Sequence, residues 1–268
     1  MSNLICIFLL IASLNINYDF LLLNSIKIKS QTITTDNLEN VYVSNNNQLL
    51  KFNNKGVLQC NYSNVSRGPI SFVDATDPFR VLVYYSNFNQ LIFLDNMLAE
   101  IGSPIKLDDL GIEQTAIACA STQGGFWIYD KQNCILISYN KNLQVVNKGS
   151  KLNVLIGENT NPNCLIAKNN QIYMNIPEIG ILVFDQFGTY LKTIPIKLLA
   201  SFQIQNDELM YCKLDSQLLV FKLNKLDLKT NAEKNIILPD REGILDAKLE
   251  QDKLYIKKEQ NIDIYEIK

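Results

Sequence analysis

Short apolar and polar blocks alternate along most of this chain, and they recur in the same order. In the stretch DNLENVYVSNNNQLLKFNNKG, residues 36–56, a polar turn precedes an apolar strand that carries an aromatic residue. A second polar turn then separates this strand from another apolar strand. Short apolar runs bounded by Asn, Asp and Gly are typical of β-strands, and the stretch therefore predicts a β-hairpin.

The hairpin occurs six times, with further copies beginning at Asp77, Gln123, Asn169, Asn206 and Gln251. When the copies are aligned on one large residue of the first strand, they lie 38 to 46 residues apart, and a large residue of the second strand follows 10 to 12 positions later. The aligned pairs are Tyr42 and Phe52, Leu82 and Leu94, Trp127 and Tyr139, Tyr173 and Phe184, Tyr211 and Phe221, and Tyr255 and Tyr265. Two spacings that hold six times indicate an internal repeat.

Each repeat contains more than the hairpin. An apolar or β-branched run precedes each hairpin, as in TIT and TAIACA, and another follows each of the first five, as in GVLQC and LAEI. Four antiparallel strands every 40 to 45 residues are typical of a β-propeller blade. We therefore predict an all-β, six-bladed β-propeller of four-stranded antiparallel blades over residues 31–268, preceded by an apolar leader over residues 1–30.

Closure of the ring leaves two alternatives, because the sixth copy ends after its third strand at Lys268. Either residues around 14–24 supply the missing outer strand, or blade 6 has three strands. We expect a three-stranded blade 6 whose edge is protected by lysines such as Lys257 and Lys258, since charged edges discourage strand addition.

The blades resemble those of NHL-type and TolB-like six-bladed propellers. Phrases such as DPFRVLVYY and FGTYLKTIPI are similar in particular to uncharacterised envelope propellers of Gram-negative bacteria, and the resemblance covers residues of about 30 to 268. It implies the propeller architecture and a place in the bacterial envelope. It says little about activity, because propellers carry unrelated functions.

The apolar run LICIFLLIASL, residues 4–14, is too short to span a bilayer comfortably and resembles the central region of a secretory signal. No Lys or Arg precedes it. We expect export to the periplasm or cell envelope with cleavage between about residues 13 and 31, and membrane contact only through this segment if it is retained. The alternative is a buried N-terminal strand or helix of a cytosolic protein.

Composition removes several kinds of chemistry. The chain has no histidine, which excludes Ser-His-Asp and Cys-His catalysis and zinc sites built on histidine. A net charge of −2 without a basic stripe disfavours nucleic acid as a partner. The six cysteines form no CxxC pair and are interpreted as scattered free thiols. We expect no cofactor, no metal and no catalytic residue.

Candidate binding residues lie in the loops that join successive blades. Arg67 and Arg241 precede the inner strands of blades 2 and 6, where they could hold an anionic ligand or an acidic peptide. Tyr84, Tyr85 and Phe88 lie near the channel mouth of blade 2 and would form a surface for a partner or a glycan if exposed. Solvated arginines and core aromatics are the alternative interpretations.

The leading functional hypothesis is a non-catalytic exported propeller that binds a protein partner, or acts as a scaffold, in the bacterial envelope. The alternative is a Ca²⁺-dependent hydrolase similar to lactonases or gluconolactonases, with its site at the channel mouth. Its candidate ligands are the carboxylates and amides of the longest connections: Asp108, Asp109, Glu113, Glu158, Asn159 and Asn161. A third hypothesis is carbohydrate or peptide sensing through an exposed patch of Tyr84 to Phe88.

Overall fold

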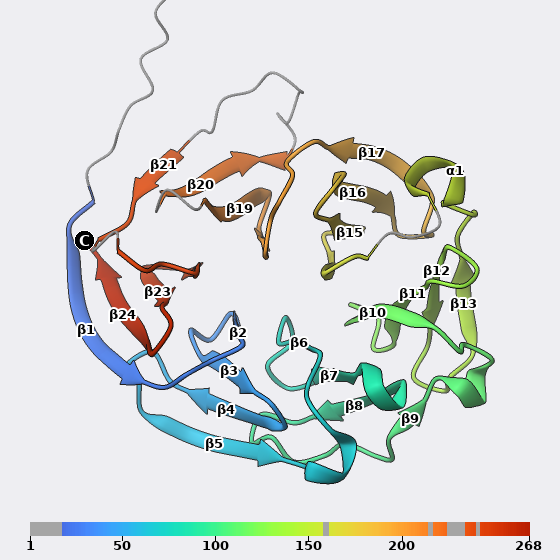
Figure 1. Cartoon of the computed structure of the whole chain (residues 1–268), viewed down its shortest axis with the longest axis horizontal. Coiled ribbons are helices and arrows are strands. Elements are labelled where there is room, and N and C mark those ends of the chain that lie inside the picture. The colour runs from blue at the N-terminus through green and yellow to red at the C-terminus, as the bar shows by residue number, and fades with distance from the viewer. Residues whose placement is uncertain (1–17, 158–160, 214–216, 224–233, 240–241) are drawn as a thin grey trace, which may run out of the picture.

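Six four-stranded antiparallel sheets are arranged in a ring, so the chain is a six-bladed β-propeller as predicted (Figure 1). The computed structural model describes residues 18–157, 161–213, 217–223, 234–239 and 242–268. In each blade the strand nearest the axis comes first and the chain then runs outward, and blade 6 alone takes its outer strand from the opposite end of the chain.

The elements follow the repeats. Blade 1 consists of β2 (Thr32–Thr35), β3 (Val41–Asn45), β4 (Gln48–Phe52) and β5 (Leu58–Ser63). Blade 2 consists of β6 (Phe72–Asp74), β7 (Val81–Tyr85), β8 (Gln90–Leu94) and β9 (Ile105–Lys106). Blade 3 consists of β10 (Thr115–Ala120), β11 (Phe126–Asp130), β12 (Ile135–Tyr139) and β13 (Val145–Lys148). Blade 4 consists of β14 (Cys164–Lys168), β15 (Gln171–Ile176), β16 (Gly180–Asp185) and β17 (Tyr190–Ile194). Blade 5 consists of β18 (Gln203–Gln205), β19 (Glu208–Lys213), β20 (Gln217–Lys222) and β21 (Lys234–Ile237). Blade 6 consists of β22 (Asp246–Glu250), β23 (Lys253–Lys257), β24 (Asn261–Ile267) and β1 (Phe20–Lys27). Four short helical turns lie in the loops: η1 (Val65–Arg67), η2 (Ser86–Phe88), η3 (Asp108–Leu110) and α1 (Asn153–Ile156).

The core lies between the blades rather than at the axis. Six hydrophobic clusters of described residues each fill one of the six seams between neighbouring blades. The aligned residues Tyr42, Trp127 and Tyr173 are buried in these seams, on the second strand of their blades. Both faces of a blade are therefore apolar, which explains the nearly continuous apolar strands of the sequence.

A repeated Asx turn fixes the register between the third and fourth strands of blades 1 to 4. The side-chain oxygens of Asn53, Asp95, Asn140 and Asp185 each accept hydrogen bonds from the backbone N–H groups two and four residues later, at 2.8 to 3.0 Å. The residue three positions after each has positive φ, and in blades 1 and 4 it is glycine, which adopts this conformation without steric cost.

Ring closure differs from the sequence expectation. Strand β1 pairs antiparallel with β24, so blade 6 has four strands, and the expected three-stranded blade was wrong. Phe20 packs edge-on against Tyr265 with ring centroids 6.3 Å apart, and the Lys268 N–H donates to the Asp19 carbonyl at 3.0 Å. The physical reason is that β24 would otherwise leave a row of unpaired backbone groups beside apolar side chains.

The lysines expected to protect an open edge have other contacts. Lys257 donates to the Gln31 carbonyl, and Lys258 lies 3.1 Å from the Asp263 carboxylate. Only residues 28–31 separate β1 from the inner strand of blade 1, a shorter crossing than the sequence analysis allowed for. The outer strand of blade 6 thus lies within residues 1–30, the segment assigned to the leader.

The outer strand of blade 2 is also irregular. The predicted strand LAEI contributes a single bridge between Leu94 and Glu100, and the regular pairing moves on to β9. Gly102, with φ of 73°, and Pro104, which has no N–H to donate, interrupt the strand between these two places.

Two further observations concern the cysteines and the helices of the described residues. The five cysteines among the described residues are free thiols, as the sequence indicated, and Cys6 lies outside those residues. Within the described ranges, no helix has the length and apolar character needed to cross a bilayer.

Candidate functional site

A cavity follows the axis of the ring. It has a volume of about 570 Å³ and is lined by the inner strands of blades 1, 2, 4, 5 and 6 together with their flanking residues. Cavities that hold small ligands commonly have volumes of roughly 300 to 1,000 Å³. The channel is therefore large enough for a small molecule.

A ladder of polar side chains lines one side of this channel, between the inner strands of blades 5 and 6. Ser201 Oγ donates to the Asp246 carboxylate at 2.8 Å, and Lys248 Nζ contacts both Ser201 and Asp246. Further along, Gln203 accepts from the Leu249 N–H at 2.9 Å, and its amide donates to Glu250 Oε1 at 3.2 Å. We call these residues the polar ladder: Ser201, Gln203, Gln205, Asp246, Lys248 and Glu250.

Glu250 ends the ladder where three blades meet. Its Oε1 accepts from the Thr35 hydroxyl of blade 1 at 2.7 Å as well as from Gln203 of blade 5. Burial raises the pKa of Glu250 to about 7, and the nearby Asp36 charge adds to this effect, while the Thr35 hydrogen bond and the Lys168 charge oppose it. This carboxyl group therefore changes its charge near neutral pH.

Two other carboxylates at the same end of the channel are held by hydrogen bonds. Asp74 is buried and accepts from the backbone N–H groups of Thr76 and Ala120 at 2.9 and 2.8 Å. Burial raises the pKa of Asp74, and these hydrogen bonds counteract the effect. Asp36 accepts from the N–H groups of Leu38 and Asn40, both at 2.9 Å.

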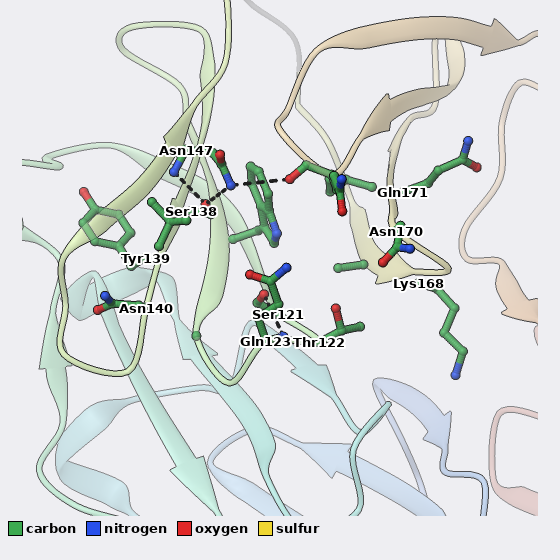
Figure 2. A pocket seen from close by; sticks show the side chains of 16 residues that line it. Ser121, Thr122, Gln123, Ser138, Tyr139, Asn140, Asn147, Lys168, Asn170 and Gln171 are labelled. Atoms are coloured by element: carbon green, nitrogen blue, oxygen red, sulfur yellow. Dashed lines mark hydrogen bonds between the residues drawn. The ribbon is translucent and has the colours of Figure 1, made fainter.

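Lys168 is a cation whose charge acts on two of these carboxylates. Its positive charge lowers the pKa values of both Asp74 and Glu250, although their burial outweighs it. The side chain of Lys168 makes no hydrogen bond or ion pair with any described residue, and it lines the channel. In Figure 2 its side chain runs away from the other labelled residues.

A second, smaller cavity lies between blades 3 and 4, with a volume of about 70 Å³ (Figure 2). Its lining is rich in amides and hydroxyls, including Asn147, which donates to Ser138 Oγ at 3.1 Å and to the Gln186 carbonyl at 3.4 Å. A space of this size holds a few water molecules rather than a ligand.

Arg67, the first predicted site residue, is already paired. Its guanidinium donates to both oxygens of Glu100, at 3.0 Å for Nη2, and to the Tyr62 hydroxyl. The hydrogen bonds to Glu100 raise the pKa of Arg67, and the same pair lowers the pKa of Glu100. An anionic ligand would have to compete with this carboxylate.

The remaining predicted site residues separate into three groups. Arg241 lies outside the described residues. Tyr84 and Tyr85 are buried, and the Tyr84 hydroxyl donates to the Thr115 carbonyl at 2.7 Å, so the expected exposed aromatic patch reduces to Phe88. Phe88 is 49% exposed on η2.

Among the ligands proposed for a Ca²⁺ site, the described carboxylates Asp108, Asp109 and Glu113 do not form a group placed to hold a metal ion. Asp108 accepts from Asn89 at 2.6 Å and Asn161 accepts from Lys131 at 2.7 Å, while Glu158 and Asn159 lie outside the described residues. The part of the chain that the structure describes contains no group of three His, Cys, Asp or Glu residues placed to hold a metal ion. These observations give the hydrolase alternative no support.

Exposed apolar side chains lie in the loops on both faces of the ring, and the most exposed of them share one face. Antiparallel strands place the loops between blades and the turns between second and third strands on the same face, which we call the connection face. Its exposed apolar residues come from five different connections: Val65, Phe88, Val154, Leu155, Leu198 and Leu245. Val154, Val65 and Leu198 are 95%, 83% and 79% exposed, whereas no large apolar side chain described on the opposite face is more than 61% exposed. Apolar side chains exposed to this degree are candidates for contact with a partner.

The sequence analysis did not identify the polar ladder. Its signal is the strict alternation in the segment DAKLE, residues 246–250, where every second residue is charged, and in SFQIQ, residues 201–205. Period-two alternation places Asp246, Lys248 and Glu250 on one face of β22. The apolar residues of the inner strands predict the seams between blades, whereas the polar residues that alternate with them predict the channel wall.

Comparisons with known proteins support the fold and leave the activity open. No family model and no curated protein sequence matches the chain. Among solved structures, it is similar to the WD40 domain of Neurospora crassa Pan2 (TM-score 0.60, 12% identity, 92% of this chain and 95% of that chain covered). It is also similar to a streptogramin B lyase (TM-score 0.60, 9% identity, 94% and 98% covered) and to virginiamycin B lyase from Staphylococcus aureus (TM-score 0.55, 11% identity, 87% and 79% covered). Identities this low establish the propeller fold alone.

Proposed function

We propose that this protein is an exported, non-catalytic propeller of the NHL or TolB-like type that binds a protein partner of the cell envelope through its connection face. The observation that carries the proposal is that the three most exposed large apolar side chains of the described residues, Val154, Val65 and Leu198, all lie on that face. An apolar centre surrounded by polar loops is the usual composition of a protein interface. Phe88 and Leu198 are the large side chains most suited to anchor a partner.

The test is crosslinking and affinity capture from the native envelope fraction with a C-terminal tag. The variant carries Phe88→Ser, Val154→Ser and Leu198→Ser. Its matched control carries Met97→Ser, Leu143→Ser and Phe187→Ser, which alter exposed apolar residues in the third-to-fourth strand turns on the opposite face. We expect one stoichiometric envelope protein with the wild type and the control, and its loss with the connection-face variant. Equal capture by both variants would contradict the proposed surface.

Export rests on the apolar run of residues 4–14. If a leader is removed, we propose that cleavage falls before Asp19, because Asp19 and β1 complete blade 6. This narrows the expected range from 13–31 to about 13–18. The intact mass of the protein recovered from the periplasm measures the site, and a mature chain that begins inside residues 20–31 would refute this assignment.

A further inference from the structure

The end of the channel opposite the connection face carries side chains of opposite charge that do not form an ion pair. Glu250 and Lys168 line the same cavity, and the charge of Lys168 acts on Glu250, yet no ion pair joins them. Glu250 accepts hydrogen bonds only from neutral groups, such as those of Thr35 and Gln203, so its charge has no contact with a cation among the described residues. A molecule that bridged the two side chains would give both charges an ionic partner.

The hydrogen bonds around Glu250 hold it ready for a ligand. Thr35 and Gln203 fix Oε1 from two different blades, so the carboxylate keeps one orientation at the junction of blades 5, 6 and 1. Fixed polar groups bind a ligand with less loss of conformational entropy than mobile ones. Lys168, at the end of β14 in blade 4, approaches from another side of the ring.

The charge balance of this end selects among small ligands. Asp36, Asp74 and Glu250 would repel a phosphate or another multiply charged anion. Lys168 would repel a simple amine that has no anionic group. A molecule with one ammonium and one carboxylate satisfies both sides.

We propose that this end of the channel binds a small amino-acid-like zwitterion, with its ammonium group at Glu250 and its carboxylate at Lys168. The cavity of about 570 Å³ accommodates a free amino acid or a short peptide. The site is independent of the protein-binding surface proposed above, because it uses the channel wall rather than the connection face.

The test is isothermal titration of the purified full chain with each of the common free amino acids and with alanine di- and tripeptides. Each ligand that binds is compared with its C-terminal amide and its N-acetyl form, which remove one charge each. We expect binding in the micromolar to millimolar range and a loss of about ten-fold or more for each blocked form. Tighter binding of the free amino acid or of the peptide identifies the source of the zwitterion.

Two variants assign the charges. Lys168→Met should abolish the preference for the free carboxylate over the amide, and Glu250→Gln should abolish the preference for the free amine over the N-acetyl form. The matched controls are the exposed residues Lys192→Met and Glu178→Gln, which should leave both preferences unchanged. If Glu250→Gln fails to fold, the Lys168 variant and the binding of the blocked ligands to the wild type still show whether the channel binds a zwitterion.

A pH series adds a second readout. The groups that act on Glu250 are Asp36 and Thr35 of blade 1, Lys168 of blade 4 and the neutral Gln203 and Gln205 of blade 5. The charge of Glu250 in turn acts on Tyr255 of its own blade. Since the pKa of Glu250 is about 7, affinity for the ammonium group should rise as the pH increases through that value, and Glu250→Gln should remove the rise. The proposal is overturned if no zwitterion binds up to roughly 10 mM, or if the blocked forms bind equally well.

Discussion

The seam between blades 3 and 4 and the seam between blades 5 and 6 reach the channel in different ways. In the former, the inner strands meet through Ile117, Cys119, Leu165 and Ala167, all of them buried and apolar. In the latter, an apolar cluster occupies the middle of the seam, but the inner edge consists of the polar ladder. The same blade architecture therefore supports two kinds of wall around one channel.

The difference separates stability from binding. The apolar seam removes its side chains from water, and burial of this kind supplies most of the free energy of folding. The polar ladder exchanges hydrogen bonds with water for hydrogen bonds within the protein, which contributes little net stability but is costly to leave incomplete. The ladder keeps charged groups at the channel, where a ligand can reach them.

Loss of β1 should have the largest effect, because it opens the ring beside the ladder. We expect deletion of residues 1–27 to abolish cooperative unfolding and to promote association through the exposed edge of β24, since unpaired strand edges recruit other strands. Circular dichroism melts and size-exclusion chromatography measure both changes. Deletion of residues 1–17 is the control and should unfold cooperatively, because β1 is retained. Similar melts for both deletions would show that closure is dispensable.

Truncation in the apolar seam should come next. Trp127 is buried between blades 3 and 4, where its ring lies against Gly188 of the neighbouring blade. Trp127→Ala should reduce the free energy of unfolding by about 3 to 5 kcal/mol through lost burial and a cavity. Urea denaturation measures the change, with the exposed Phe187→Ala as a control expected within about 0.5 kcal/mol of the wild type. If Trp127→Ala lowered the free energy of unfolding by less than the ladder variants do, the polar ladder rather than the apolar seam would be the main source of stability.

The pH dependence of stability should distinguish the ladder from the apolar seam. The folded state raises the pKa of Glu250 from the ordinary 4.5 to about 7, so its contribution is complete below pH 4.5 and is lost as the pH rises through about 7. Between these values the wild type should lose roughly 3 kcal/mol relative to Glu250→Gln. Urea denaturation at several pH values tests this, and parallel curves for the two proteins would exclude it. Asp74 is present in both proteins, so its own titration cancels.

The smallest expected change lies at the other end of the ladder. Ser201→Ala removes the hydroxyl that Asp246 and Lys248 share but leaves their ion pair, which spans 3.3 Å. We expect a loss of about 1 kcal/mol in the free energy of unfolding. Ser71→Ala, at an exposed channel residue that bonds Ser86, serves as the control and should cost less than about 0.5 kcal/mol. A loss of several kcal/mol would mean that the ladder stabilises the ring as strongly as the apolar seams.

Part of the site was predictable and part was not. The loops around Arg67 and Phe88 were placed correctly on one face, since turn residues and strand alternation locate them. The pairing of Arg67 with Glu100, 33 positions away, and the burial of Tyr84 and Tyr85 depend on how blades 1, 2 and 3 pack. The alternation of charged and apolar residues over 246–250 indicates the blade 6 side of the polar ladder. The residues that bind it, such as Gln203 and Thr35, belong to other blades and could not be predicted from this alternation.

By itself, the sequence determined the repeat, the number of blades and the positions of buried residues such as Tyr42 and Trp127. These features follow from contacts within one repeat, where alternation and turn chemistry act over about 10 to 12 residues. Only the tertiary structure decided that β1 closes blade 6 against β24, and that Thr35 meets Glu250 across 215 positions of chain. Such contacts depend on the ring returning to its start, and no local pattern of side chains specifies where two distant strands meet.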